Sequence, residues 1–182
     1  MTLRFQFPVI DTCSAVLEDY LSKAFSSLPL FTVSTTIFHA KKEPKISISN
    51  YIDRFNKFSE CSESCYIAAL IYLDRVIQKT KYKFTLCNIH RLYLAAMVLA
   101  IKFNEDKYYD NQCYAAIGGV DPNELRELEI EMLQLLDFRL FIPDFEYKKY
   151  LTAMESYYRY LMSGRKKSSD LETDNSADSR TT

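Results

Sequence analysis

The amino-acid sequence predicts an all-α protein in which helices pack around one central, almost wholly apolar helix. Three observations support this prediction. The 182-residue chain contains only three glycines, too few for a turn-rich all-β fold. Apolar residues recur three and four positions apart in successive segments, which is the spacing of one helix face. All five prolines stand between these segments, where a residue that cannot donate to the helix ladder is tolerated.

The composition is that of a globular protein and argues against several function classes. Apolar residues make up 48% and charged residues 26% of the chain, and the formal net charge is -1. That charge provides no general attraction to nucleic acid or to an anionic membrane. No apolar run approaches the roughly 20 residues of a membrane span. With three glycines, no glycine-rich phosphate-binding loop can be written.

The cysteines and the N-terminal segment indicate a reducing compartment. The five cysteines are odd in number, and the first residues lack the charged region and long apolar stretch of a signal peptide. Disulfides persist mainly in oxidising compartments. We therefore expect a protein of the cytoplasm, the nucleus or both.

Capping residues and apolar periodicity place the helices. The first helix follows Pro8, takes Asp11 and Thr12 as capping residues and extends to about Ser26. An aperiodic loop over 27–46 comes next. Five helices follow, and their expected capping or first residues are Ser47 or Ser49, Ser62, Thr85, Asp110 and Asp121.

Three of these helices carry clear local signals. The central one includes Leu92–Ile101, a stretch without any charge, and should be buried on nearly all sides. Gly118 should end the fourth helix, because glycine tolerates the left-handed conformation that follows a helix. Asp121, Pro122 and Glu124 form the pattern of an N-cap, a first-turn proline and a capping box at the start of the fifth.

The C-terminal part divides into a helix and a tail. The last helix begins at Pro143 and Asp144 and should reach about Met162. From Gly164 onward the chain has one leucine and no aromatic residue, so we expect a disordered tail. The expected organisation is an N-terminal helix and loop over 1–44, a five-helix domain over 45–142, a C-terminal helix over 143–163 and the tail over 164–182.

Candidate metal and nucleophile sites are few. Cys61 and Cys65 are four residues apart, but a zinc site needs two further ligands and no second Cys/His pair has ligand spacing. Cys87 and His90 are three apart at a helix start, and packing or capping explains that spacing better than an activated thiolate. His39 lies in the loop. We therefore expect no metal, no cofactor and no catalytic residue.

Four glutamates lie on the fifth of the five helices. General acid–base chemistry needs two carboxylates across a cleft, and a row on one helix lacks that arrangement. A solvated helix face accounts for Glu124, Glu127 and Glu131. Glu129 differs, because it follows Leu128 and points towards the contact with the central helix.

Arg54 and Asp74 are each one of few charges on a mostly apolar helix. Buried charges in proteins are found paired. An ion pair that joins the two helices is therefore the more economical interpretation, and two separate surface charges are the alternative.

Lys102 stands between Ile101 and Phe103, directly after the uncharged stretch. Its stem can lie along apolar surface while the ammonium reaches solvent. A cation near a helix C-terminus also interacts favourably with the helix dipole. These effects explain why a lysine is tolerated there, but they give no reason for its place beside Phe103.

Four segments in order resemble a cyclin box. They are ISISNYIDRFNKFS, CYIAALIYLDRVIQ, TLCNIHRLYLAAMVLAIKFNED and YAAIGGVDPNELRELEIEMLQLLDFRL, and the resemblance covers residues 45–142. The details are most similar to P-type or U-type cyclins, a group that includes the yeast phosphate-pathway cyclin and proteins of plants and protists. The resemblance implies a single all-α cyclin box and a regulatory subunit, not an enzyme, that binds and activates a cyclin-dependent serine/threonine kinase.

The resemblance also implies roles for particular residues. Lys102 and Glu129 match the lysine and the glutamate with which cyclins hold the C-helix region of the kinase. Asp74 matches the aspartate of the family's second helix, and Arg54 resembles its arginine partner. The apolar positions that line the kinase surface in this family correspond to Leu99, Phe103, Ile130, Leu133, Phe138 and Leu140.

The sequence departs from mitotic cyclins in two ways. YIDRFNKF stands where they carry the MRAIL segment that docks substrate peptides, and the chain has no room for their second repeat. The alternative function is a cyclin-fold scaffold for a transcription complex or nucleic acid. A basic stripe would favour it, and none is present beyond Arg165–Lys167. The kinase and its substrates are not identified, and cell-cycle control and nutrient or phosphate signalling both stay open.

Overall fold

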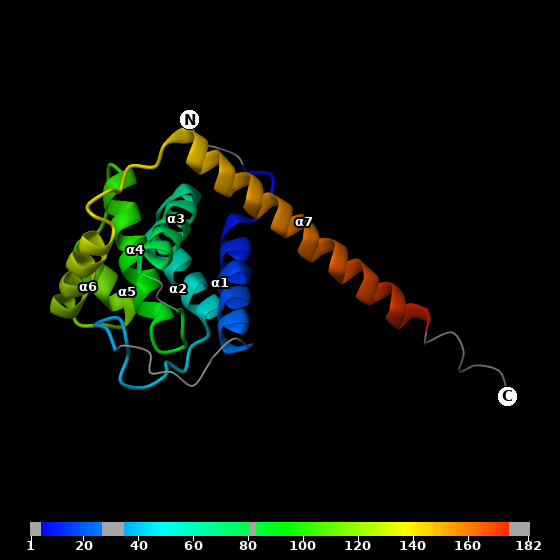
Figure 1. Ribbon diagram of the computed structural model, residues 1–182, viewed down its shortest axis with the longest axis horizontal. Helices are drawn as coiled ribbons and strands as arrows, with labels where there is room; N and C mark the ends of the chain where they lie inside the picture. Colours follow the sequence, from blue (N-terminus) through cyan, green and yellow to red (C-terminus); the bar gives the residue numbers. More distant parts are fainter. Residues whose placement is uncertain (1–4, 27–34, 81–82, 175–182) are drawn as a thin grey trace.

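The computed structural model describes residues 5–26, 35–80 and 83–174, which contain seven helices (Figure 1). The helices are α1 (Val9–Ser26), α2 (Ile48–Ser59), α3 (Glu63–Thr80), α4 (Ile89–Asn104), α5 (Asn111–Gly118), α6 (Pro122–Leu135) and α7 (Asp144–Asp174). No strand occurs within the described ranges. Helices α2–α6 pack together and α1 and α7 flank them, so the predicted all-α architecture is confirmed.

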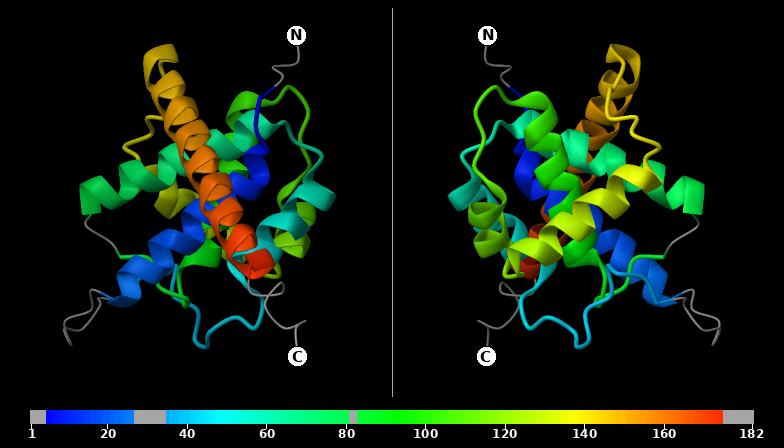
Figure 2. Two further views of the ribbon diagram at one scale, coloured as in Figure 1. Left: turned by 90° about the vertical axis from the view of Figure 1, so that its right-hand side faces the viewer. Right: turned by 90° about the vertical axis from the view of Figure 1, so that its left-hand side faces the viewer.

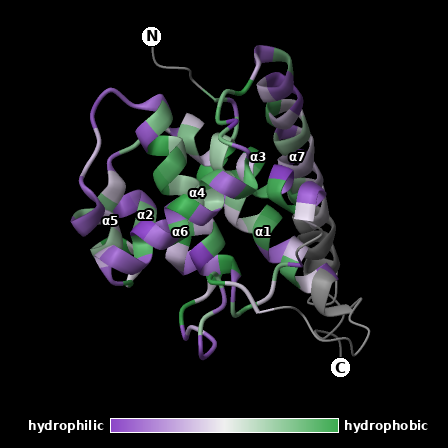
Figure 3. Cartoon of the chain, turned by 60° about the vertical axis from the view of Figure 1, so that its left-hand side comes forward, coloured by the Kyte–Doolittle hydropathy of each residue, from purple (hydrophilic) through white to green (hydrophobic). Residues whose placement is uncertain are grey.

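Helix α4 is the buried centre of the molecule, as its uncharged stretch predicts. Every residue from Leu92 to Ile101 is at most 4% exposed. The helix contacts α2, α3, α5 and α6. In Figure 3 its hydrophobic residues lie in the middle of the bundle. Burial of apolar surface contributes roughly 25 cal/mol per Å², so this helix supplies a large part of the hydrophobic stabilisation.

Three predicted N-caps are confirmed. The side chain of Ser47 accepts a hydrogen bond from the backbone N–H of Asn50, at 3.1 Å. Asp110 and Asp121 do the same at the starts of α5 and α6, where each satisfies a backbone N–H that the helix leaves unpaired.

Other predicted helix ends differ from the structure. Helix α4 begins after Asn88, and the hydroxyl of Thr85 is buried without a hydrogen-bond partner among the described residues. Gly118 is the last residue of α5, and Gly119 takes the left-handed conformation with φ 70°. Glu124 forms a salt bridge with Arg91 of α4, so a contact between helices takes the place of the capping box.

The flanking helix α1 begins earlier than its expected capping residues. It starts at Val9, and the hydroxyl of Thr12 donates to the carbonyl of Pro8 at 2.7 Å within the first turn. Helix α1 packs against α2, α3 and α7. Figure 2 shows α7 crossing over α1 on one side of the bundle. The two flanking helices therefore cover the same side of the five-helix domain.

Helix α7 is longer than predicted. We expected it to stop near Met162, with Gly164 as its end, and it instead continues through Gly164 to Asp174 (Figure 1). A glycine inside a helix costs only about 1 kcal/mol, so one glycine without other breakers does not stop the helix. The last predicted tail residues, 175–182, and the loop residues 27–34 lie outside the described ranges.

Candidate protein-docking surface

Lys102 and Glu129 are joined by a salt bridge between α4 and α6. The Lys102 Nζ lies 2.6 Å from Glu129 Oε1. Asn111, at the start of α5, bonds to both partners: its Oδ1 accepts from Lys102 Nζ at 2.5 Å, and its Nδ2 donates to Glu129 Oε2 at 2.5 Å. Three helices thus contribute one polar side chain each to a closed set of hydrogen bonds.

The salt bridge is partly withdrawn from water. Glu129 is only 7% exposed as a residue, and the Lys102 side chain is 27% exposed. A carboxylate with so little solvent needs charged or polar partners, because an unpaired buried charge is costly. Lys102 and Asn111 supply them. In the free chain Lys102 and Glu129 therefore face each other, as well as lying at the positions that the resemblance assigns to kinase binding.

Exposed aromatic and aliphatic side chains lie on the same helices as this salt bridge and in the turn after α6. Phe103 is 50%, Ile130 is 49% and Phe138 is 69% exposed. Leu133 and Leu140 are half-buried and pack against the core. These five residues with Lys102, Asn111 and Glu129 form what we call the docking surface. Large apolar side chains grouped on a surface and flanked by charges are typical of protein-binding sites.

Leu99 is the one predicted apolar surface position that lies in the core. It is 4% exposed on the central helix α4. One turn further along α4, Phe103 is exposed. Leu99 therefore supports the docking surface from beneath, and contact with a partner is not available to it in this arrangement.

The backbone after α6 holds Phe138 in an uncommon conformation. Asp137 and Phe138 have φ angles of 51° and 58°, in the left-handed region that disfavours residues with a Cβ. The Phe138 N–H donates to the carbonyl of Leu133 at 2.9 Å. This turn projects the phenyl ring into solvent. A strained backbone that exposes an aromatic ring is characteristic of a functional position.

Side chains of α3 hold the segment after Phe138 in place. The Tyr72 hydroxyl donates to the carbonyl of Leu140 at 2.8 Å, and the Arg75 guanidinium donates to the carbonyl of Arg139 at 2.8 Å. Phe141 and Phe145, which sequence analysis missed, are 72% and 76% exposed beside it. Their signal in the sequence is weak, because Phe141 precedes the last helix and Phe145 lies in its first turn, where helix periodicity does not show whether a side chain is exposed.

Arg54 and Asp74 do not form the predicted ion pair, so that prediction was wrong. The guanidinium of Arg54 donates to the carbonyl of Ile117, and its carbon lies 5.4 Å from the centroid of the Tyr51 ring. Arg54 thereby joins α2 to the end of α5. The Asp74 carboxylate accepts hydrogen bonds from Gln78 at 2.6 Å and from Tyr150 of α7. The two charges belong to separate contacts.

The remaining titratable candidates have structural partners. His39 Nδ1 accepts from the backbone N–H of Thr36 at 3.0 Å, and His90 Nε2 donates to the carbonyl of Ile46 at 2.9 Å. Burial lowers the pKa of His90. No group of three or more metal-ligating side chains occurs within the described part of the chain. Cys61 and Cys65 remain free thiols, as do the other three cysteines.

The glutamates of α6 divide differently from the prediction, because Glu124 belongs to a salt bridge and not to a solvated face. Glu127 is exposed and Glu131 half-buried, whereas Glu124 pairs with Arg91 and Glu129 with Lys102. Each paired glutamate contacts α4, and this arrangement orients α6 on the central helix.

The match to a protein-family model covers all five helices α2–α6. The sequence model of the cyclin family matches residues 14–140, more than half of the chain. This chain belongs to the cyclin family. Cyclins are regulatory proteins and not enzymes. None of the helices in the described ranges is long and apolar enough to cross a membrane.

Similar plant proteins narrow the type of cyclin. Cyclin-P3-1 of Oryza sativa subsp. japonica is 43% identical over 107 residues, which cover 59% of this cyclin and 45% of that protein. Cyclin-U3-1 of Arabidopsis thaliana is 44% identical over 107 residues, covering 59% and 48%. Cyclin-U1-1 of Arabidopsis thaliana is 34% identical over 126 residues, covering 69% and 60%. The chain is thus a cyclin of the P/U type, and it spans between about half and three fifths of these relatives' lengths.

Proposed function

We propose that this cyclin binds and activates a cyclin-dependent serine/threonine protein kinase through the docking surface. The observation that supports the proposal best is the partly buried salt bridge of Lys102 and Glu129 on helices that also carry the exposed side chains of Phe103 and Ile130, with exposed Phe138 directly after α6. A folding role alone accounts for the salt bridge, but it does not explain why these large apolar side chains are exposed. We further propose that the protein acts in the cytoplasm, the nucleus or both.

Activation in this proposal requires no chemistry from the cyclin. An active protein kinase needs the pairing of its β3 lysine with the glutamate of its C-helix. A rigid surface that binds only the inward position of that helix shifts the kinase towards the active state, by as much as its affinity differs between the two states. The packed helices α4 and α6 provide such rigidity.

The polar side chains of the docking surface orient the kinase. Lys102 carries donors and Glu129 acceptors that can exchange their mutual contact for backbone groups of the kinase C-helix region. Asn111 holds both side chains in place before binding. Fewer side-chain rotamers then have to be ordered when the partner arrives, which is the benefit of preorganisation.

Capture followed by an activity assay tests the proposal. The full chain, immobilised, is exposed to extract from its source cells, and bound kinases are identified by mass spectrometry and assayed on a serine/threonine peptide. We expect a cyclin-dependent kinase to be retained, and Phe138→Ala to abolish its retention. Tyr160→Ala is the matched control, because Tyr160 is also an exposed aromatic residue, at 71%, but lies on α7, which contributes no residue to the docking surface. Recovery of nucleic acid or a transcription complex without a kinase would support the scaffold function instead.

A further inference from the structure

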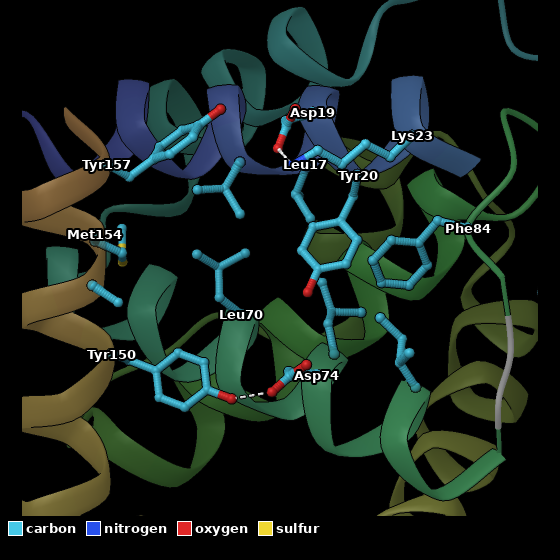
Figure 4. A pocket seen from close by; sticks show the side chains of 14 residues that line it. Leu17, Asp19, Tyr20, Lys23, Leu70, Asp74, Phe84, Tyr150, Met154 and Tyr157 are labelled. Carbon is cyan, nitrogen blue, oxygen red and sulfur yellow. Dashed lines mark hydrogen bonds and ion pairs between the residues drawn. The ribbon is translucent and has the colours of Figure 1, made fainter. Parts of the chain in front are cut away.

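A cavity of about 350 Å³ lies between α1, α3 and α7 (Figure 4). Its apolar lining includes Leu17, Leu70, Leu73, Ile77, Phe84 and Met154. Ligand pockets in proteins have volumes of about 300–1,000 Å³ and apolar walls with a few polar groups. The cavity meets both criteria, and none of its lining residues belongs to the docking surface.

Asp74 places a carboxylate in the wall of this cavity. Its hydrogen-bond donors are the amide of Gln78 and the hydroxyl of Tyr150, both of which are uncharged. Figure 4 shows the contact with Tyr150. No lysine, arginine or histidine of the described ranges forms a salt bridge with Asp74. The neighbouring Arg75 is engaged with Glu146, at 2.6 Å. Within the described ranges the half-buried negative charge therefore has hydrogen bonds but no salt-bridge partner.

The opposite wall adds an ion pair, formed by Asp19 and Lys23, and a hydroxyl. Asp19 of α1 is paired with Lys23 at 2.5 Å. The hydroxyl of Tyr20 points from α1 towards the α3 side of the cavity in Figure 4. The Tyr20 ring packs edge-on against Phe84, with the centroids 5.8 Å apart. Burial and the charge of Asp74 raise the pKa of Tyr20, so the hydroxyl stays protonated at neutral pH.

We propose that this cavity binds a small amphipathic amine. The ammonium group pairs with Asp74 and hydrogen-bonds the hydroxyl of Tyr20, and the apolar body lies against Leu70, Leu73 and Ile77. The site is distinct from the docking surface and goes beyond the proposed function.

The charge of Asp74 and the volume of the cavity favour a small amphipathic amine over other ligands. An anionic amphiphile such as a fatty acid would place its carboxylate beside Asp74, and like charges at close range disfavour binding. A neutral apolar molecule would desolvate the Asp74 carboxylate without supplying a cation, which costs free energy. A charged hydrogen bond to an ammonium compensates for that desolvation. The volume of about 350 Å³ lies near the lower end of ligand pockets, which favours a small molecule.

Three probes of one shape test the proposal on the full chain. They are 4-phenylbutylamine, 4-phenylbutan-1-ol and 4-phenylbutyrate, which share the phenyl group and a four-carbon chain and carry a cationic, a neutral and an anionic head group. Isothermal titration calorimetry at pH 7 should give the amine an affinity about tenfold higher than that of the alcohol, and no measurable binding of the carboxylate. Methyl signals of Leu70, Leu73 and Ile77 should shift on addition of the amine in a methyl-labelled NMR sample.

Two substitutions and one control locate the binding site. Asp74→Asn keeps the side-chain volume and an acceptor, and should bring the amine down to the affinity of the alcohol. Ala153→Trp should abolish binding of both, because Ala153 lines the cavity from an exposed position on α7 where a large side chain is compatible with folding. Asp53→Asn, an exposed carboxylate on α2, should change nothing. Thermal unfolding confirms that each variant is folded.

Several results would overturn the proposal. Equal affinities of the wild-type protein for amine and alcohol would show that the ammonium charge contributes nothing to binding. A preference for the amine that persists in Asp74→Asn would show that Asp74 does not bind the ammonium. Binding that survives Ala153→Trp would place the ligand elsewhere. If Asp74→Asn does not fold, the three probes and Ala153→Trp still test the proposal. If the wild-type chain does not bind the amine, the proposed site is refuted.

Discussion

Lys102 Nζ and Glu129 Oε1 lie 2.6 Å apart across the contact between α4 and α6, and the two residues are 27 positions apart in the chain. Asn111 bonds to both of them. These side chains therefore serve the fold of the free cyclin before any partner binds. In the proposed complex they exchange at least part of this mutual contact for contacts with the kinase, so stability and binding depend on the same atoms.

Lys102→Ala should weaken kinase binding at least about tenfold and also lower stability. The stability loss, about 1–3 kcal/mol, arises because Glu129 would remain buried with Asn111 as its polar partner. The double change Lys102→Met with Glu129→Gln removes both charges and keeps a partner for Asn111. It should recover part of the stability while kinase binding stays weak. Denaturant unfolding and titration with the kinase separate the two effects, and wild-type affinity of the double variant would rule out a binding role.

Phe138→Gly should stabilise the protein and weaken kinase binding. Relief of the left-handed conformation at φ 58° should add about 1 kcal/mol to the free energy of unfolding, and little packing is lost because the ring is 69% exposed. Phe138→Ala keeps the strained backbone and should weaken binding equally without stabilising. If both variants unfold at the same denaturant concentration, the turn stores no strain.

Arg54→Met and Asp74→Asn should have additive effects on stability. Arg54 contacts Ile117 and Tyr51, whereas Asp74 contacts Gln78 and Tyr150, so no partner is shared. Changes in independent sites add within about 0.5 kcal/mol. A double-mutant cycle by denaturant unfolding measures the interaction term. A coupling of 2 kcal/mol or more, roughly the size expected of a broken buried ion pair, would mean that the two side chains pair in solution.

Cys61 should be the most reactive thiol of the protein. Hydrogen bonding from Cys65 lowers its pKa to about 7. Burial raises the pKa of Cys13, and the contact with Asp110 raises that of exposed Cys113. Because the thiolate is the nucleophile, iodoacetamide at pH 7 should modify Cys61 about tenfold faster than Cys113.

The pH dependence of this reaction shows whether the pKa of Cys61 is lowered or raised. The rate at Cys61 should fall as pH drops below about 7 and level off above it, since a thiolate with a lowered pKa persists to lower pH. Cys65→Ala removes the donor and should move the profile upward towards that of an ordinary cysteine. Peptide mass spectrometry resolves the sites. A profile unchanged by Cys65→Ala would show that this contact does not set the reactivity.

Deletion of residues 165–182 should leave stability and kinase binding nearly unchanged. The part of α7 that packs on the core lies upstream and includes Tyr150, Met154 and Tyr158. Thermal unfolding of the shortened chain should stay within a few degrees of the full chain. Deletion from residue 150 onward is the contrasting variant and should destabilise, because it uncovers Leu17 and Leu70. A large loss from the shorter deletion would reveal a packing role for the end of α7.

Local sequence determines where most helices of this cyclin lie. Ser47, Asp110 and Asp121 accept hydrogen bonds from backbone groups two or three residues away, so their capping roles follow from neighbours in the chain. The uncharged stretch Leu92–Ile101 predicts its own burial, because a helix without a polar face has to be enclosed. Gly164 shows the limit of this reasoning, since the helix continues through it.

Partners between helices depend on the tertiary structure. Lys102 and Glu129 matched family positions, yet their mutual contact and the part played by Asn111 depend on how α4, α5 and α6 are rotated about their axes. Arg54 and Asp74 looked like a pair because each charge stands on an apolar helix, but the packing of α2 and α3 directs them to different neighbours. Helix rotation is set by close packing of the whole core. Capping and periodicity act over only a few residues and contain no information about it.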